Sequence, residues 1–241
     1  LEYLSVAKAI KDNEAASDEK IHPLYEKLLI NQFHDILPGT CIPSAHKLAL
    51  EETGEVLEKA ADYIKAVVDG DEKYVTVTNT LSFERSDAIF LECAEGLVAD
   101  VTCKQQAYKN LDGKNVLIIS GLKIPAFSSV RINLVEGKAD AASEISVTDS
   151  GVSTPFAEIA FDSKGYIESL YDKRACREVR GEGYPLNTLL VAEDLPIAWD
   201  NWDIDPDIEL KLKPCATLLE REVVSHGDVA FIVRSKYKIS E

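Results

Sequence analysis

Methionine is absent from the 241 residues of this chain, and so are the features that mark several classes of protein. No apolar run approaches the ~18 residues of a membrane-spanning helix. No secretory signal peptide opens the chain, and no Asn-x-Ser/Thr glycosylation site occurs. The chain starts at Leu1 inside a helical pattern, without the Met or small residue of a natural start. We therefore expect a piece of a longer protein with no membrane partner.

Basic residues are also scarce. The chain has 26 Lys and Arg against 42 Asp and Glu, so its net charge is −16. Such an acidic chain repels phosphate groups, which argues against nucleic-acid binding and against docking on anionic membranes. The five cysteines are odd in number and lack C-x-x-C spacing, so neither a disulfide framework nor a cysteine zinc site is indicated. These features predict a cytoplasmic protein and leave a homo-oligomer open.

The residues that are present give a globular composition, with 46% hydrophobic and 28% charged residues. Residues 1–70 carry a helical pattern in three segments, the last two divided by Pro38-Gly39. The third segment, residues 42–68, has apolar residues at spacings of three and four, with one heptad step across Glu52. Its apolar residues are Ile42, Ala45, Ala49, Val56, Ala60, Tyr63 and Val67. Three helices with short connections predict an antiparallel bundle.

After Gly70 the apolar period falls to the value of two that is typical of strands. Hairpin turns rich in Gly, Asp or Asn are expected at residues 112–115, 162–165 and 226–228. The predicted strands cover residues 74–78, 88–93, 116–120, 129–134, 145–147, 156–161, 166–171, 220–225 and 229–239. Short strands with regular turns are typical of β-sandwiches.

The expected fold class is therefore α+β, with a three-helix bundle followed by antiparallel β-sandwich domains. The bundle is expected at residues 1–70 and a small β-sandwich unit at residues 71–136. Part of a larger C-terminal β-sandwich is expected at residues 145–241, after a small, polar stretch that resembles a linker.

The first candidate for chemistry is a His beside an Asp, at the end of an apolar helix and just before a Pro-Gly break. These residues are His34 and Asp35. A neutral His is a good zinc ligand, and a neighbouring carboxylate can accept hydrogen bonds from hydroxyl groups. A His near a helix C-terminus also interacts favourably with the helix dipole, and an Asp can be ordinary surface charge. One His and one Asp cannot complete a zinc site, which needs three or four ligands.

Three stretches resemble the motifs of family 38 glycoside hydrolases, the class II α-mannosidases. Residues 28–50, LLINQFHDILPGTCIPSAHKLAL, are similar to the family segment that joins the catalytic domain to a helical bundle. Residues 75–92, VTVTNTLSFERSDAIFLE, resemble the start of the family's β-rich region. Residues 193–205, EDLPIAWDNWDID, resemble a D-x-P-x-x-W-D-x-W-x-I-D run of bacterial members. The three motifs occur in family order.

The resemblance implies a parent enzyme that is a retaining, zinc-dependent α-mannosidase hydrolysing terminal α-D-mannosides of oligosaccharides. One carboxylate would be the nucleophile and a second would serve as acid and then base. The resemblance maps His34 onto a ligand of the single zinc ion and Asp35 onto a residue that holds sugar hydroxyls. The other ligands and both catalytic carboxyl groups would lie in an N-terminal barrel domain before Leu1, so the fragment alone is expected to be inactive.

Two other His patterns are poor candidates for zinc binding. His226-Gly227-Asp228 is a His-x-Asp sequence, but it lies at an expected hairpin tip, and a Gly-Asp turn explains it better. His22 and His46 flank His34, and their sequence neighbours match no ligand motif. We interpret both as surface or cap residues.

The acidic run around Trp199 and Trp202 leaves two interpretations open. An EF-hand loop counted from Asp203 fails, because positions 208 and 214 lack the required Gly and Glu. In a strand, Asp203, Asp205 and Asp207 would share one face, which Lys211, Lys213 or solvent would neutralise. The indoles beside these carboxylates could hold a sugar or fill a domain interface, and the interface is the favoured interpretation.

One alternative to an enzyme fragment belongs to another class of protein. In it, the chain is a non-catalytic β-sandwich module that binds glycan or packs other domains, and the residues around His34 are purely structural. Zinc content separates the two hypotheses, because the parent enzyme should carry about one zinc ion per chain and the module none.

Overall fold

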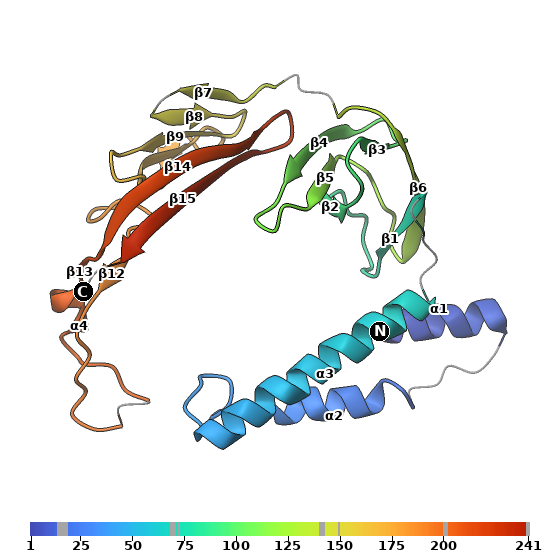
Figure 1. Ribbon diagram of the computed structural model, residues 1–241, viewed down its shortest axis with the longest axis horizontal. Coiled ribbons are helices and arrows are strands. Elements are labelled where there is room, and N and C mark those ends of the chain that lie inside the picture. Colours follow the sequence, from blue (N-terminus) through green and yellow to red (C-terminus); the bar gives the residue numbers. More distant parts are fainter. Residues whose placement is uncertain are drawn as a thin grey trace. The chain divides into compact units, whose positions relative to one another are not determined.

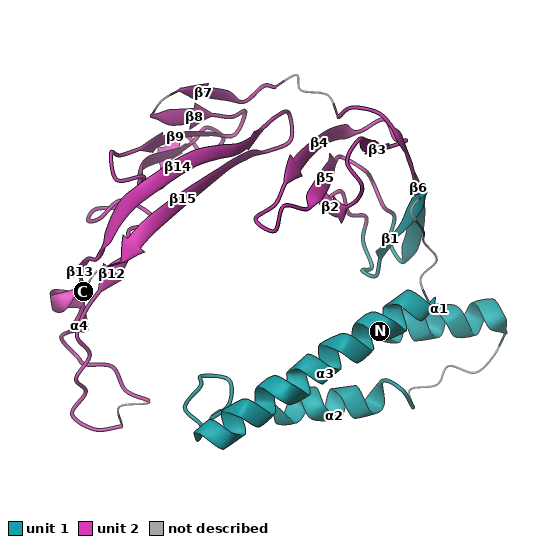
Figure 2. Cartoon of the chain, in the orientation of Figure 1, with its two compact units in different colours: residues 1–83, 125–131 teal, residues 84–124, 132–241 magenta. Residues whose placement is uncertain are grey.

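The computed structural model describes residues 1–13, 19–67, 71, 73–139, 143–148, 150–199 and 202–239. It confirms a mixed α+β chain with several antiparallel sheets (Figure 1). The chain divides into two compact units, residues 1–83 with 125–131, and residues 84–124 with 132–241 (Figure 2). The three-part division expected from the sequence stays a prediction. None of the described helices is long and apolar enough to span a membrane.

The first unit contains the three helices that the sequence predicted. They are α1 (Glu2–Asp12), α2 (His22–Ile30) and α3 (Pro43–Val67). Helix α1 ends at Asn13, whose left-handed conformation is a common C-terminal stop. Helices α2 and α3 both carry Pro in the first turn, where its missing N–H costs no hydrogen bond.

The long helix α3 packs against both α1 and α2. Its predicted apolar stripe has the correct phase: Ala49 is buried, and Ala45, Val56, Ala60, Tyr63 and Val67 are half-buried. Ile42 is the exception, since it precedes the helix and is exposed. The contact with α2 buries Ile21 and Leu24. One face of α3 is therefore covered, as the helical period requires.

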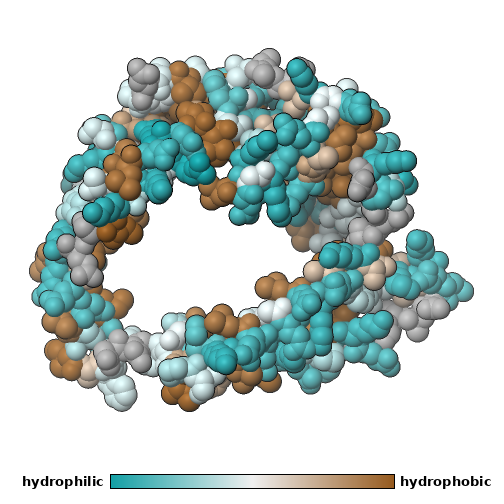
Figure 3. Space-filling model, in the orientation of Figure 1, coloured by the Kyte–Doolittle hydropathy of each residue, from teal (hydrophilic) through white to brown (hydrophobic). Residues whose placement is uncertain are grey.

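Many apolar side chains of the helical region nevertheless remain on the surface. Figure 3 shows brown, apolar side chains over α2 and α3. The exposed apolar residues of this region include Leu29, Ile30, Phe33, Leu37, Leu48, Leu50 and Leu57. The contacts of α1, α2 and α3 with each other leave these side chains uncovered. Exposed apolar side chains gathered in one region suit an interaction site.

The β region begins with two three-stranded sheets. One has the order β1-β6-β3, with β1 (Tyr74–Asn79), β6 (Ser128–Glu136) and β3 (Leu97–Ala99). The other has the order β2-β5-β4, with β2 (Ile89–Glu92), β5 (Asn115–Ser120) and β4 (Lys104–Lys109). Strand β5 supplies the centre of the core, because four consecutive residues, Val116–Ile119, are buried.

A five-stranded antiparallel sheet follows, with the order β11-β10-β9-β8-β7. Its strands are β7 (Ser146–Thr148), β8 (Gly151–Ser153), β9 (Ala157–Phe161), β10 (Ile167–Asp172) and β11 (Arg177–Glu178). The expected hairpin at residues 162–165 joins β9 to β10. Asp162 accepts backbone N–H bonds from Lys164 and Tyr166, and Gly165 supplies the left-handed conformation that the turn needs.

The chain ends in the long hairpin of β14 (Ala216–His226) and β15 (Phe231–Ile239). The buried ring of Tyr166, in the β9–β10 turn, stacks on Tyr237 of β15 with the centroids 5.5 Å apart. A two-stranded ladder of β12 (Leu190–Val191) and β13 (Lys213–Pro214) precedes the hairpin, together with the one-turn helix α4 (Ile208–Lys211).

Candidate functional site

The segment that carries the predicted site continues from the end of α2 as a series of turns. Phe33 N–H bonds to the carbonyl of Ile30, and the N–H groups of Ile36 and Leu37 both bond to the carbonyl of Phe33. Gly39 ends the series with φ of 80°, which a side chain would strain. The sequence predicted that the helix stops at Pro38-Gly39, but α2 ends earlier, at Ile30, and turns continue the chain to Gly39.

Asn31 fixes the start of this segment. It is 6% exposed, and its side-chain amide donates to the Lys27 carbonyl at 2.8 Å and to the Glu52 carboxylate of α3 at 2.7 Å. One turn away, Lys27 forms an ion pair with Glu55 of α3. These contacts join α2 to α3 directly before the predicted site. Glu52 is the residue that the apolar stripe of α3 steps across, and the bond to Asn31 explains why a carboxylate occupies that face.

His34 and Asp35 lie on the surface of the segment. The exposed fractions of their side chains are 69% and 41%, and His34 Nε2 is 3.9 Å from the Asp35 carboxylate. The imidazole also packs against the ring of Phe33, with the centroids 4.2 Å apart. Behind them, the Thr40 hydroxyl donates to the Asp35 carbonyl at 3.3 Å. Both functional groups can therefore be reached by a ligand while their backbone is held by turns.

The donor set of this segment suits zinc only in part. An exposed imidazole is a good zinc ligand, and a carboxylate beside it can bind metal or a hydroxyl group. Among the described residues, however, no group of three or more His, Cys, Asp and Glu side chains could hold a metal ion. As a zinc ligand, His34 would need further ligands that the described residues do not place beside it.

The remaining His residues have structural partners or simple surface positions. His22 lies 3.5 Å from Glu26 on the same helix, and the side chain of His46 is exposed on α3. The expected turn at His226-Gly227-Asp228 is confirmed as the tip of the β14–β15 hairpin. His226 Nε2 donates to the Ile145 carbonyl at 2.7 Å, and Asp228 lies 3.1 Å from the Lys104 ammonium. The two side chains of this His-x-Asp sequence thus contact separate partners.

The acidic run after Trp202 is not a strand, which corrects one expectation. It leads through turns into α4, where Lys211 bonds Asp205 at 2.6 Å and Asp207 at 2.7 Å. These bonds lower the pKa of Asp205 to about 2 and raise the pKa of Lys211. The sequence offers Lys211, Lys213 or solvent to neutralise the run, and in the structure Lys211 does so.

The two indoles beside the acidic run are presented on the surface. Trp199 is 77% exposed and Trp202 is 56% exposed. The Trp199 carbonyl accepts the N–H groups of Trp202 and Asp203. Residues 200 and 201 of the motif lie outside the described residues. Exposed indoles suit either a sugar face or a domain interface, so both interpretations stay open.

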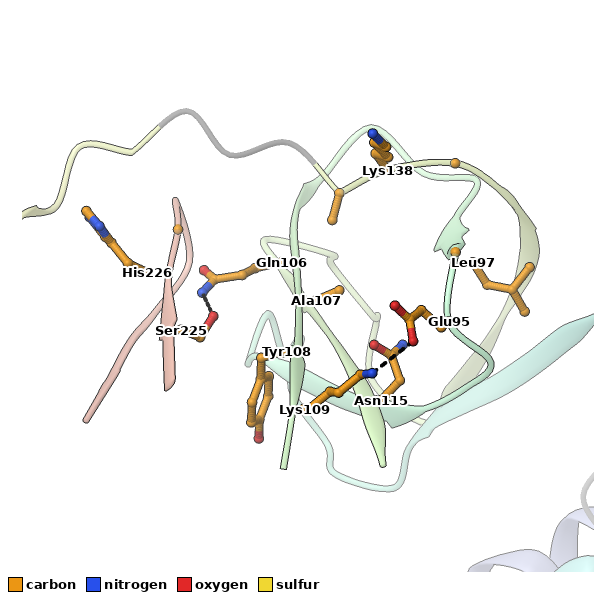
Figure 4. A pocket seen from close by; sticks show the side chains of 14 residues that line it. Glu95, Leu97, Gln106, Ala107, Tyr108, Lys109, Asn115, Lys138, Ser225 and His226 are labelled. Carbon is orange, nitrogen blue, oxygen red and sulfur yellow. Dashed lines mark hydrogen bonds and ion pairs between the residues drawn. The ribbon is translucent and has the colours of Figure 1, made fainter. Parts of the chain in front are cut away.

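A cleft that no motif predicted is lined by β4, residue 115, residues 95–97, residues 137–139 and the tip of the β14–β15 hairpin (Figure 4). Its volume is about 470 Å³, and Glu95 and Lys109 form an ion pair of 3.1 Å at its edge. Sequence reasoning missed it because its residues come from separate segments. Of its lining, the sequence features cover only Asn115 in the expected 112–115 turn, residues 137–139 in the polar linker stretch, and the hairpin tip.

Two family models of known proteins match this chain, one at its N-terminal end and one at its C-terminal end. Residues 1–69 match the family model described as the alpha mannosidase middle domain. Residues 152–241 match the model of the glycosyl hydrolases family 38 C-terminal domain. Human alpha-mannosidase 2C1 is 26% identical over 196 residues, which cover 77% of this chain and 17% of the relative. Alpha-mannosidase G of Dictyostelium discoideum is 24% identical over 270 residues, covering 93% of this chain and 24% of the relative.

Solved structures show the same fold. A family 38 glycosyl hydrolase from Enterococcus faecalis superposes with a TM-score of 0.60 and 11% identity, covering 95% of this chain and 33% of its own. An alpha-mannosidase from Enterococcus faecalis V583 gives a TM-score of 0.53 and 9% identity, with 96% and 36% covered. The chain thus spans a third or less of most of these relatives' lengths.

Proposed function

Because this chain belongs to glycosyl hydrolase family 38, we propose that it is the middle and C-terminal part of a retaining, zinc-dependent α-mannosidase that removes terminal α-D-mannosides from oligosaccharides. The observation that carries the proposal is the exposed His34–Asp35 pair, held on an anchored segment inside the matched middle domain. The names of the curated relatives point to the same activity. In this proposal, helices α1–α3 are the three-helix bundle and the later sheets form β-sandwiches.

His34 and Asp35 would have different tasks. The neutral imidazole of His34 would give one nitrogen ligand to the zinc ion, and the Asp35 carboxylate would accept a hydrogen bond from a hydroxyl group of the bound sugar. When bound, the zinc ion would supply positive charge that holds hydroxyl oxygens of the mannose. The anchored backbone would limit how far either group can move, since a misplacement of ~1 Å in a site can cost ~100-fold in rate.

The nucleophile, the acid/base and the other zinc ligands would come from the rest of the parent chain. The apolar side chains exposed on α2, α3 and the segment after α2 support this, because they suit packing against another domain. The absence of a complete metal site among the described residues is compatible with the same view. The isolated fragment would then bind neither zinc nor mannoside tightly.

The second candidate is a non-catalytic module that binds glycan, and the exposed Trp199 and Trp202 favour it. The zinc content of the purified protein distinguishes the zinc-dependent enzyme from the glycan-binding module. The parent enzyme should hold about one zinc ion per chain that a chelator removes with loss of activity, and a module should hold none.

The experiment is made on the full-length parent enzyme. His34→Ala should lower zinc content and mannosidase activity together, and Asp35→Asn should lower activity while zinc stays bound. His46→Ala is the matched control, because this exposed His lies on the next helix and has no proposed ligand role. Full zinc content and a normal rate for His34→Ala would overturn the assignment of that residue.

A further inference from the structure

We propose that the tip of the β14–β15 hairpin, residues 225–230, is a latch that docks on Gln106 of β4 and holds the hairpin against the β2-β5-β4 sheet. Gln106 is separated from the latch by about half of the chain, with sequence separations between 119 and 124 residues. The contact belongs to one compact unit of the protein. It is independent of the enzymatic role proposed above.

The side-chain amide of Gln106 uses its full hydrogen-bonding capacity on the latch. Its Nε2 donates to the Ser225 hydroxyl at 2.6 Å and to the Ala230 carbonyl at 2.9 Å. Its Oε1 accepts the backbone N–H groups of Val229 at 3.1 Å and Ala230 at 2.9 Å. An amide group has two donor hydrogens and two acceptor lone pairs, so every position is matched.

Burial makes these bonds important for stability. Gln106 is only 5% exposed, although Gln is a residue that usually remains at the surface. A buried amide that loses its partners keeps the cost of desolvation without compensation. If the latch moved away, both the Gln106 amide and the backbone groups at 229 and 230 would lose these partners. Water would take the place of these partners, so each bond contributes a modest net stabilisation, and the four bonds together favour the docked arrangement.

The lack of a side chain at Gly227 lets the latch approach Gln106 closely. A Cβ atom added at Gly227 would lie 2.5 Å from both Cδ and Oε1 of Gln106, which is closer than real Cβ contacts. The Gln106 side chain cannot move aside without breaking its four bonds. Glycine thus allows the tip to approach β4, and this explains the Gly in the His226-Gly227-Asp228 sequence. Figure 4 shows Gln106 and Ser225 facing each other across this contact.

Three further contacts hold the latch from its sides. The Ser143 hydroxyl donates to the Gly227 carbonyl at 2.9 Å, and His226 Nε2 donates to the Ile145 carbonyl. Lys104, two residues before Gln106 on the same face of β4, pairs with Asp228. Each residue of the His-Gly-Asp sequence thus has a docking role, which gives this sequence a function other than metal binding.

The test uses hydrogen exchange on the full chain of 241 residues. Gln106→Ala should raise exchange in the peptide covering residues 225–231 by ~10-fold or more, because two or more net hydrogen bonds are lost. The matched control is Gln105→Ala. Gln105 is the neighbouring residue of β4, and both ends of its amide bond to Ala99, away from the latch. This control should leave exchange of residues 225–231 unchanged.

Equal exchange of residues 225–231 in the two variants would overturn the proposal, and so would no change in Gln106→Ala. If Gln106→Ala does not fold, the hydrogen exchange of residues 225–231 is measured in Gln106→Glu instead. The Glu side chain has nearly the same size and can still accept from Val229 and Ala230, but it cannot donate to the Ala230 carbonyl. Faster exchange confined to the latch supports the proposal, and exchange like that of the unaltered chain contradicts it.

Discussion

The side-chain amide of Asn31 donates a hydrogen bond of 2.7 Å to the Glu52 carboxylate, and this bond joins the end of α2 to the middle of α3. Asn31 is three residues before His34 and begins the series of turns that carries it. The same amide also donates to the Lys27 carbonyl at the end of α2. The position of His34 is therefore tied to the packing of the two helices.

Replacing Asn31 with Ala should lower the free energy of unfolding by ~1–3 kcal/mol. The change removes two hydrogen bonds, one of them to a charged acceptor, at a buried position. Chemical denaturation of the 241-residue chain followed by far-UV circular dichroism measures it. Gln32→Ala is the control, because the Gln32 side chain is exposed. An Asn31→Ala variant as stable as this control would contradict the anchoring role.

A charge on the covered stripe of α3 should disrupt the helical region. Val56 is half-buried on that stripe, so Val56→Asp would place an unpaired carboxylate where it loses water. We expect a loss of at least ~1–3 kcal/mol in unfolding free energy. In the parent enzyme, zinc content and mannosidase activity should fall with it, although Val56 lies outside the proposed site.

Glu58→Lys is the control for Val56→Asp, because its side chain is on the exposed side of α3 and should be nearly silent. Glu55 is unsuitable as a control, since it pairs with both Lys27 and Lys59. An unchanged melting temperature for Val56→Asp would show that the helical phase has no importance for stability.

The stability of the helical region should depend on pH through Glu55. Hydrogen bonds from Lys27 and then Lys59 lower the pKa of Glu55 from 4.5 to about 2. A carboxylate with a lowered pKa in the folded state stabilises the protein above its ordinary pKa of 4.5. This contribution is lost as the pH falls from 4.5 towards 2, when the folded state must also bind the proton.

Melting temperatures measured across this pH range test the expectation. Glu55→Gln should show a smaller loss of stability on acidification than the unaltered chain, because the charge is already absent. Glu58→Gln serves as the matched control on the same helix and should retain the full pH dependence. High salt should weaken the effect, since the pairs are partly exposed. An identical pH profile for Glu55→Gln and the unaltered chain would contradict the assignment.

The chain of 241 residues alone should not hydrolyse mannosides, because its proposed nucleophile and acid/base lie in the rest of the parent. An aryl α-mannoside assay of the purified chain, with and without added zinc, measures this. Zinc-dependent turnover above background would show that the catalytic groups lie within these residues. The same preparation with His34→Ala identifies any turnover that depends on the proposed ligand.

Local sequence determined the helices and most hairpins. The phase of α3 follows from apolar residues three and four apart, and the turn at residues 162–165 follows from Asp162 and Gly165, which bond and bend within a few residues. The adjacent pair His34 and Asp35 was found for the same reason. Information of this kind is contained in a short window of the chain, so it can be read before the fold is known.

Elements that depend on distant partners were missed. The short strands β3, β8 and β11–β13 and the one-turn helix α4 carry too few residues for a periodic signal. Strand β4 was missed because its central buried residue is polar. Gln106 resembles a surface residue until the latch, more than a hundred positions away, supplies its partners.

The sequence by itself determined the resemblance to family 38 and the α+β class, and its prediction of zinc and sugar contacts at His34 and Asp35 stays a prediction. Only the tertiary structure decided that Glu52 belongs on the covered face of α3, that Lys211 neutralises Asp205, and that the His-Gly-Asp tip docks on β4. The physical reason is the same in each case. A polar group can be buried or held only when its partner is in place, and the partner's position is set by the folding of the whole chain.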